Sequence, residues 1–184
     1  MRNWLTRKMI TRFGNHYHYD VSYLYYMLQH QPALTSQFLQ IGNRLGKARR
    51  IPASVKCTAQ LVAMRHEDCG PCLQLQVQIA AEAGMAEAEI RAALLHKPEQ
   101  LSPDNALAYH YAQALMANSA TLPEAQQAIV QRFGDSGLVE LAVVTQAARL
   151  YPMVKKGLGH SQACTQLQLG ESTIALGRHM EGRA

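Results

Sequence analysis

Apolar side chains recur three and four positions apart along most of the chain, which is the spacing of one face of an α-helix. Near the N-terminus, for example, Leu5, Met9 and Phe13 follow this spacing, with basic residues between them. No segment shows a clean alternation of apolar and polar positions, and the Asn-Gly and Asp-Gly turns typical of hairpins are missing. The pattern therefore predicts an all-α protein.

Residues that begin or end helices predict where the individual helices lie. Pro52 and Ser54 begin one helix, Gly84 ends another, and Pro152 either kinks or ends a third. We expect helices over residues 3–13, 20–29, 35–45, 52 to the CxxC motif, that motif to 84, 86–95, 102–117, 122–133 and 138–151, with a short piece at 153–158. The residues from about Gly170 are polar and predict a loosely ordered tail.

Composition and charge narrow the class of protein. The chain has 184 residues, of which 48% are hydrophobic, and this suits one domain with a substantial core. The net charge is +5, but the basic residues are scattered rather than interleaved with aromatic residues, so we expect no nucleic-acid partner. No apolar run approaches the ~20 residues that span a bilayer, and no signal peptide is evident. We therefore expect a cytoplasmic protein without a transmembrane segment.

The stretch HEDCGPC holds the feature that points most directly to chemistry, a CxxC motif formed by Cys69 and Cys72. In a reducing compartment, such a pair indicates redox chemistry or a metal site more than a structural disulfide framework. A zinc site needs about four ligands and would have to recruit His66, Cys57 or Cys164, since no second CxxC or HxxxH pair exists. A third alternative is that both cysteines are small core residues.

The predicted position of the motif at a helix start favours redox use. Unpaired N–H groups and the positive end of the helix dipole lower the pKa of a thiol there, most strongly for Cys69. Pro71 is well tolerated in a first helical turn. The negative charges of Glu67 and Asp68 have the opposite effect and raise the pKa of a nearby thiol. Either carboxylate can instead accept the proton of an attacking thiol. The residues indicate a dithiol/disulfide pair, and we predict no metal and no cofactor.

A set of consecutive segments carries a resemblance to a known family. The segments are SVKCTAQLVAMRHED, CGPC, LQLQVQIAAEAGM and MAEAEI, followed later by LVELAVVTQAARLYPMVKKGLG. Over about residues 51–159 the chain resembles the alkylhydroperoxidase D-like (AhpD-like) / carboxymuconolactone decarboxylase family. The resemblance implies an AhpD-like helical bundle that forms a dimer, trimer or hexamer. It divides the single domain 1–184 into an N-terminal helical extension (1–50), an AhpD-like core (51–159) and a C-terminal tail (160–184).

The resemblance also implies a reaction. Redox members of this family reduce small-molecule peroxides through the CxxC pair and are re-reduced by a dithiol or a partner protein. By this analogy Cys72 is the attacking cysteine and Cys69 the resolving one. The helix dipole alone favours Cys69 instead, so the two arguments disagree about which thiol attacks.

The sequence departs from the family pattern at the positions that move protons. Gln76 stands where the family has a histidine four residues after the motif, and Pro71 stands where peroxidase members can carry another. The expected upstream glutamate falls near Lys56–Cys57, which is not acidic. Glu67, with His66 beside it, is our candidate for the replacement proton acceptor. The alternative is that Glu67 is a solvated or capping carboxylate at a helix end.

These observations lead to one main hypothesis and two alternatives. The main hypothesis is an AhpD-like, peroxide-reducing thiol oxidoreductase with Cys69, Cys72 and Glu67 in its active site. One alternative, suggested by the missing histidines, is a non-catalytic oligomeric helical module with a structural or redox-sensing disulfide. The other is a carboxymuconolactone decarboxylase-like enzyme, although that branch generally lacks the CxxC. We expect the tyrosine-rich extension, which includes Tyr19 and Tyr23, to pack on the core or on a neighbouring subunit.

Overall fold

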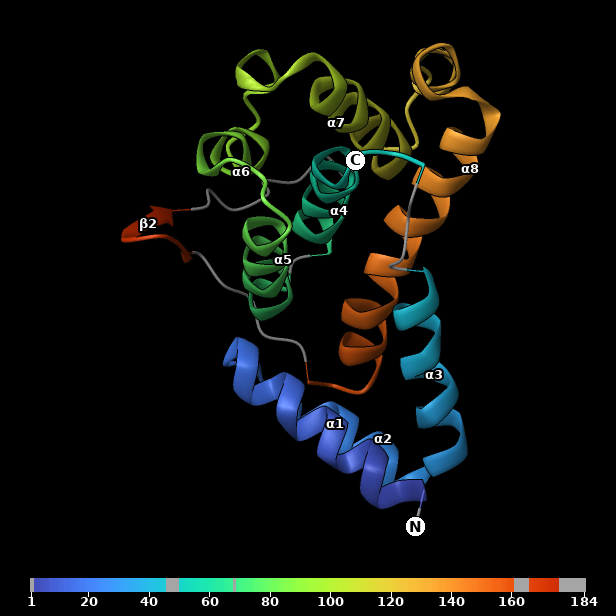
Figure 1. Ribbon diagram of the computed structural model, residues 1–184, viewed down its shortest axis with the longest axis vertical. Coiled ribbons are helices and arrows are strands. Elements are labelled where there is room, and N and C mark those ends of the chain that lie inside the picture. Colours follow the sequence, from blue (N-terminus) through green and yellow to red (C-terminus); the bar gives the residue numbers. More distant parts are fainter. Residues whose placement is uncertain (1, 46–49, 68, 161–165, 176–184) are drawn as a thin grey trace.

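The computed structural model describes residues 2–45, 50–67, 69–160 and 166–175, which form a predominantly helical fold (Figure 1). This confirms the expected dominance of helices. The helices are α1 (Arg2–Tyr17), α2 (Ser22–His30), α3 (Pro32–Leu45), α4 (Ala53–His66), α5 (Gly70–Glu82), α6 (Glu87–Leu94), the short 3₁₀ helix η1 (Pro98–Gln100), α7 (Pro103–Met116) and α8 (Leu122–Gly157). Two short strands follow, β1 (Gln166–Leu169) and β2 (Ser172–Ala175). Within the described residues, no helix is both long and apolar enough to cross a membrane.

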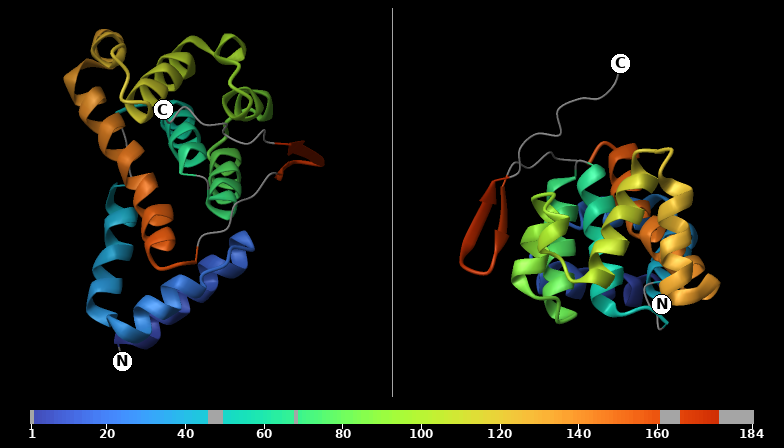
Figure 2. Two further views of the ribbon diagram at one scale, coloured as in Figure 1. Left: turned by 180° about the vertical axis from the view of Figure 1, so that it is seen from behind. Right: turned by 90° about the horizontal axis from the view of Figure 1, so that it is seen from above.

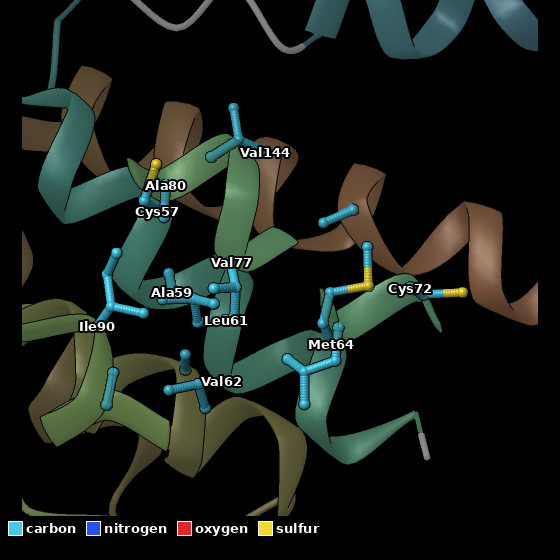
Figure 3. Packing of buried hydrophobic residues seen from close by; sticks show 14 of the residues in the cluster. Cys57, Ala59, Leu61, Val62, Met64, Cys72, Val77, Ala80, Ile90 and Val144 are labelled. Atoms are coloured by element: carbon cyan, nitrogen blue, oxygen red, sulfur yellow. The ribbon is translucent and has the colours of Figure 1, made fainter. Parts of the chain in front are cut away.

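Helix α4 lies at the centre of the fold, and its neighbours surround it. Helices α5, α6, α7 and α8 all pack against it. Its Val55, Ala59 and Leu61 side chains are at most 1% exposed. Figure 3 shows Ala59 and Leu61 close to Val77 of α5, with Ile90 of α6 on the neighbouring side. Because α4 is apolar on several sides, other helices must cover it, and α5, the next helix along the chain, is one of those that do.

Helices α1, α2 and α3 form the N-terminal layer, in which α1 and α2 lie across the ends of α5 and α8 and α3 runs alongside α8 (Figures 1 and 2). Helix α3 packs on α8, and two hydrogen bonds tie α1 to the last residue of α5. The Tyr17 hydroxyl donates to a Glu82 carboxylate oxygen at 2.7 Å, and His16 Nε2 lies 3.0 Å from the other oxygen. Ile10 and Tyr23 are each 1% exposed, so the inner face of the extension belongs to the same core as α4.

Two helix boundaries were predicted within what is now α8, one at Gly134 and one at Pro152, and the structure contains the first. At Gly134 the backbone leaves the helical path, with φ 72° and ψ 174°, and this confirms the predicted break. Pro152 is buried inside α8, and the helix continues to Gly157, so Pro152 does not end it. Gly84, which follows α5, has φ 81° and fits its predicted place just past a helix end.

The sequence-based prediction missed the antiparallel β1–β2 hairpin. Residues of β2 lie within the segment that we expected to be a loosely ordered tail, and this expectation is wrong for them. The tail residues 176–184 lie outside the described residues. Leu167, Leu169 and Ile174 of the hairpin are buried, with at most 3% of each exposed.

Helix α5 packs against β1, and its Gln74 side chain forms two hydrogen bonds with the β1 backbone. The Gln74 amide donates to the Gln168 carbonyl at 2.9 Å and accepts from the Gln168 N–H at 2.7 Å, as a neighbouring strand would. Strands of four residues with two apolar positions or fewer give a weak sequence signal. The hairpin therefore depends on contacts with α5 that the sequence pattern does not reveal.

Replacing Gly134 by alanine should lower the free energy of unfolding by about 1–3 kcal/mol, because this combination of φ and ψ is essentially restricted to glycine. In the described part of the chain, no atom beyond Gly134 and its two neighbours in sequence lies within 4 Å of the added Cβ, so the expected cost is backbone strain. Urea denaturation measures it. The matched control is Gly157→Ala, whose Cβ also meets open space but on helical backbone, and which should be neutral or stabilising. Equal effects of the two substitutions would contradict the strained break.

Candidate functional site

The CxxC motif lies at the start of α5, as predicted. Cys69 occupies the N-cap position with extended backbone (φ −111°, ψ 92°), and Pro71 lies in the first turn. Cys69 and Cys72 form a disulfide, with their Cα atoms 5.3 Å apart. Both sulfurs therefore lie near the positive end of the α5 dipole, where a thiolate is stabilised once the disulfide is reduced.

A cavity of about 320 Å³ reaches Cys72 between the N-terminal layer and the core. Four parts of the chain line it: Met9, Ile10, Phe13, Tyr19, Tyr23, Leu24 and Leu39 from the extension; Lys56, Gln60 and Met64 from α4; Cys72, Leu75, Gln76 and Ile79 from α5; Val144, Ala147, Ala148 and Tyr151 from α8. Cys69 is not part of the described lining. Of the two cysteines, Cys72 is therefore the one that borders this largely apolar cavity.

Gln76 connects three helices rather than standing alone beside the cysteines. Its side-chain amide donates to the Gln60 carbonyl oxygen at 3.2 Å, and the Gln60 amide donates to the Val144 carbonyl at 3.3 Å. Gln76 is 4% exposed. At this position, where the family pattern has histidine, the amide pair links α4, α5 and α8 and cannot take up a proton near neutral pH.

Tyr19, in the connection between α1 and α2, contacts Cys72. Its hydroxyl lies 3.5 Å from Cys72 Sγ, and both residues are buried. A disulfide sulfur carries no proton, so the tyrosine hydroxyl is the donor in this contact. Burial raises the pKa of Tyr19 to about 12, against the effect of hydrogen bonding with Tyr23, while the nearby Asp20 charge adds to the rise. The phenol therefore stays protonated at neutral pH and remains a donor.

Lys155 of α8 places a buried positive charge beside this tyrosine. Its side chain is 1% exposed, and its Nζ lies 4.8 Å from the Tyr19 ring centre and 5.5 Å from the Tyr23 ring centre. Asp20 Oδ2 lies 3.5 Å from the same Nζ. Burial alone would raise the pKa of Asp20, but hydrogen bonds from Ser22 and the charge of Lys155 outweigh burial and lower it. Asp20 therefore stays ionised as the counter-ion.

Glu67, our candidate proton acceptor, lies at the end of α4 and forms an ion pair with Arg149 of α8. The two side chains are 11% and 24% exposed. Arg149 also donates to Gln146 at 3.0 Å. This partner favours the structural interpretation of Glu67, in which the carboxylate joins the end of α4 to α8. Its role as a proton acceptor stays a prediction.

The remaining candidates do not gather at the motif. Cys57 is buried in α4 and lies apart from Cys72 in Figure 3. Burial raises the pKa of the Cys57 thiol, partly offset by Lys56, so this thiol is protonated and unreactive at neutral pH. Asp68 and Cys164 lie outside the described residues. Among those described, no three histidine, cysteine or acidic side chains form a metal-binding group.

Comparisons with known protein families, with curated proteins and with solved structures give no match to this chain. The AhpD-like resemblance therefore stays a prediction from the sequence. The disulfide, the cavity and the polar contacts of Cys72 are properties of the chain itself, and they support functional proposals independently of any relative.

Sequence reasoning identified the two cysteines but missed Tyr19 and Lys155. Tyr19 is one of several tyrosines expected only to pack, and 53 positions separate it from Cys72. Lys155 follows an apolar stretch of α8 and shows no local motif. Only the folded chain brings Tyr19 to the sulfur of Cys72 and Lys155 to the ring of Tyr19.

Glu67→Gln should lower the free energy of unfolding by about 1–3 kcal/mol, because it removes the charged acceptor from a partly buried arginine. Chemical denaturation measures the loss. The matched control is Glu87→Gln, which breaks the exposed pair with Arg91 and should cost less than about 0.5 kcal/mol.

The same Glu67→Gln variant should alkylate Cys72 in the reduced protein at nearly the wild-type rate. A large drop in this rate at neutral pH, with stability unchanged, would contradict the structural interpretation and favour the proton-acceptor role.

Proposed function

We propose that this protein is an AhpD-like thiol oxidoreductase in which Cys69 and Cys72 cycle between a dithiol and a disulfide. The observation that carries the proposal is the position of Cys72, which lies in the first turn of α5 and lines an apolar cavity. A helix N-terminus favours the thiolate, and the cavity gives a substrate access to it. Cys72 is then the attacking cysteine, and Cys69, which is not part of the described lining, is the resolving one.

The proposed oxidant is an organic hydroperoxide. The Cys72 thiolate attacks the terminal peroxide oxygen, the O–O bond breaks, and the leaving alkoxide takes a proton and departs as an alcohol. Cys72 becomes a sulfenic acid, and the Cys69 thiol attacks its sulfur, which forms the disulfide and releases water. A dithiol or a protein reductant then returns the pair to two thiols by thiol–disulfide exchange.

The lining of the cavity supports an apolar substrate. Most of its residues are aliphatic or aromatic, and the described lining contains one cationic side chain, Lys56, and no carboxylate. Such a site excludes cationic molecules and admits neutral or anionic ones. Its volume of about 320 Å³ lies at the lower end of the range for small-molecule sites, so the substrate should be compact.

We also propose that the protein acts as a cytoplasmic homo-oligomer, a dimer, trimer or hexamer. Large apolar side chains on the outer faces of the N-terminal layer support assembly. Trp4 is 64% exposed, Leu5 60% and Leu34 55%. A partner subunit packed on this layer would remove these side chains from water.

A structural or redox-sensing disulfide is the second candidate function. The burial of both residues favours it, since Cys69 is 2% exposed and Cys72 is 1% exposed. A structural disulfide resists reduction by the glutathione pool, whereas a catalytic one exchanges readily. Measurement of peroxide-dependent turnover distinguishes the catalytic disulfide from the structural or redox-sensing one.

Cys72→Ser should reduce peroxide-dependent oxidation of dithiothreitol to the rate seen without protein, because serine at this position cannot attack the peroxide. Consumption of the dithiol, followed spectroscopically, measures turnover. The matched control is Cys57→Ser, which removes a buried thiol outside the pair and should keep wild-type turnover. Undiminished turnover in Cys72→Ser would rule out the peroxidase function.

Ala147→Phe should lower kcat/KM for cumene hydroperoxide about tenfold more than for hydrogen peroxide, because the new ring fills the cavity. Val143→Phe is the matched control, since Val143 lies one turn earlier on α8, is 40% exposed and is not part of the described lining. Equal loss for both peroxides in Ala147→Phe would show that the substrate does not enter by this cavity.

A further inference from the structure

The extension supplies a hydrogen-bond chain that ends on the sulfur of the proposed attacking cysteine. Tyr19 donates to Cys72 Sγ, and Tyr19 is itself hydrogen-bonded to Tyr23. The Lys155 ammonium lies against both rings, and Asp20 balances its charge from the solvent side, where the aspartate is 53% exposed. These residues come from three separate segments and meet only in the folded chain.

We propose that Tyr19 is a catalytic residue whose hydroxyl stabilises the Cys72 thiolate, and that Lys155 is a positioning residue that holds Tyr19 and adds positive potential. This role rests on the proposed function only in taking Cys69 and Cys72 as the reacting pair. It accounts for the missing histidines, because the thiolate receives its donor from the extension instead of from α5.

Tyr19 acts in the step in which an external dithiol reduces the Cys69–Cys72 disulfide. The thiolate of an external dithiol attacks Cys69 Sγ, the Sγ–Sγ bond breaks, and its electron pair passes to Cys72 Sγ. A mixed disulfide forms on Cys69 while the negative charge rests on Cys72, where the Tyr19 hydrogen bond stabilises it. The second thiol of the same dithiol then attacks its own sulfur in the mixed disulfide and displaces the Cys69 thiolate. The dithiol leaves as a cyclic disulfide, and the protein holds two reduced cysteines.

A phenol suits this role because it can donate a hydrogen bond to the thiolate without transferring its proton to the sulfur. Burial raises the pKa of Tyr19 to about 12, so the hydroxyl donates without giving up its proton to the sulfur. The Lys155 charge acts at short range in a buried environment, where it is screened less than on the surface. A hydrogen bond to a charged group is worth more than one to a neutral group.

A test of Tyr19 must leave the other charged or titratable side chains around Cys72 unchanged. Those facing the cavity or the motif from the packed elements are Lys56 on α4, Tyr151 on α8, Tyr23 on α2, the Glu67–Arg149 ion pair, and Asp20 beside Lys155. Tyr19→Phe alters none of these side chains and keeps the ring that packs on Lys155.

The test measures the alkylation rate of Cys72 against pH in the reduced full-length protein, with mass spectrometry to separate the cysteines. In Tyr19→Phe the pH midpoint should rise by about one pH unit, so alkylation at neutral pH slows about tenfold. Lys155→Met should shift the midpoint in the same direction, and Lys155→Arg should restore it. Tyr26→Phe removes an exposed phenol of α2 and should leave the midpoint unchanged.

A folded Tyr19→Phe protein with the wild-type midpoint would overturn the proposal. If Tyr19→Phe does not fold, Lys155→Met decides, and an unshifted midpoint there has the same consequence. The readout needs no turnover, so the outcomes remain distinguishable. A shifted midpoint without peroxidase activity refutes the proposed function alone, and activity with an unshifted midpoint refutes the role of Tyr19 alone.

Discussion

The burial of α4 on all sides is the constraint on which the rest of the structure depends. From Val55 to Met64 none of its residues is fully exposed, so α5, α6, α7 and α8 must surround it. Its end at His66 forces the chain to reverse within a few residues, and α5 begins at the CxxC motif. The helix start that favours a thiolate is therefore a consequence of core packing, and the same packing places α8 beside the motif.

The N-terminal layer turns this helix start into a chemical site. Without its residues, Cys72 would have no apolar cavity above it and no Tyr19 hydroxyl beside it. The layer also covers Lys155, so the ammonium acts in an environment of low dielectric constant. Sites of this kind combine a confined apolar volume with a few fixed polar groups, and here the Tyr19 hydroxyl is the polar group in contact with the Cys72 sulfur.

Local signals explain what the sequence predicted well. Pro52, Gly84 and Gly134 act through their own backbone preferences, so the positions of α4, α5 and the break in α8 follow from neighbouring residues. The hairpin was missed because its strands are short and their tertiary contacts, such as those of Gln168 with Gln74 of α5, are not visible in the local sequence. Tyr19 and Lys155 were missed because only tertiary contacts bring Tyr19 to Cys72 and Lys155 to Tyr19. Glu67 is adjacent to the motif in sequence, yet its carboxylate is paired with Arg149 of α8.

A redox titration of the Cys69–Cys72 pair against glutathione most directly tests the claim that this disulfide is chemically active. A thiolate stabilised by the helix start and by Tyr19 favours the reduced form, so we expect reversible two-electron behaviour with a potential between about −120 and −270 mV, the range of disulfide oxidoreductases. A pair that stays oxidised below about −300 mV would be a structural disulfide and would contradict the account.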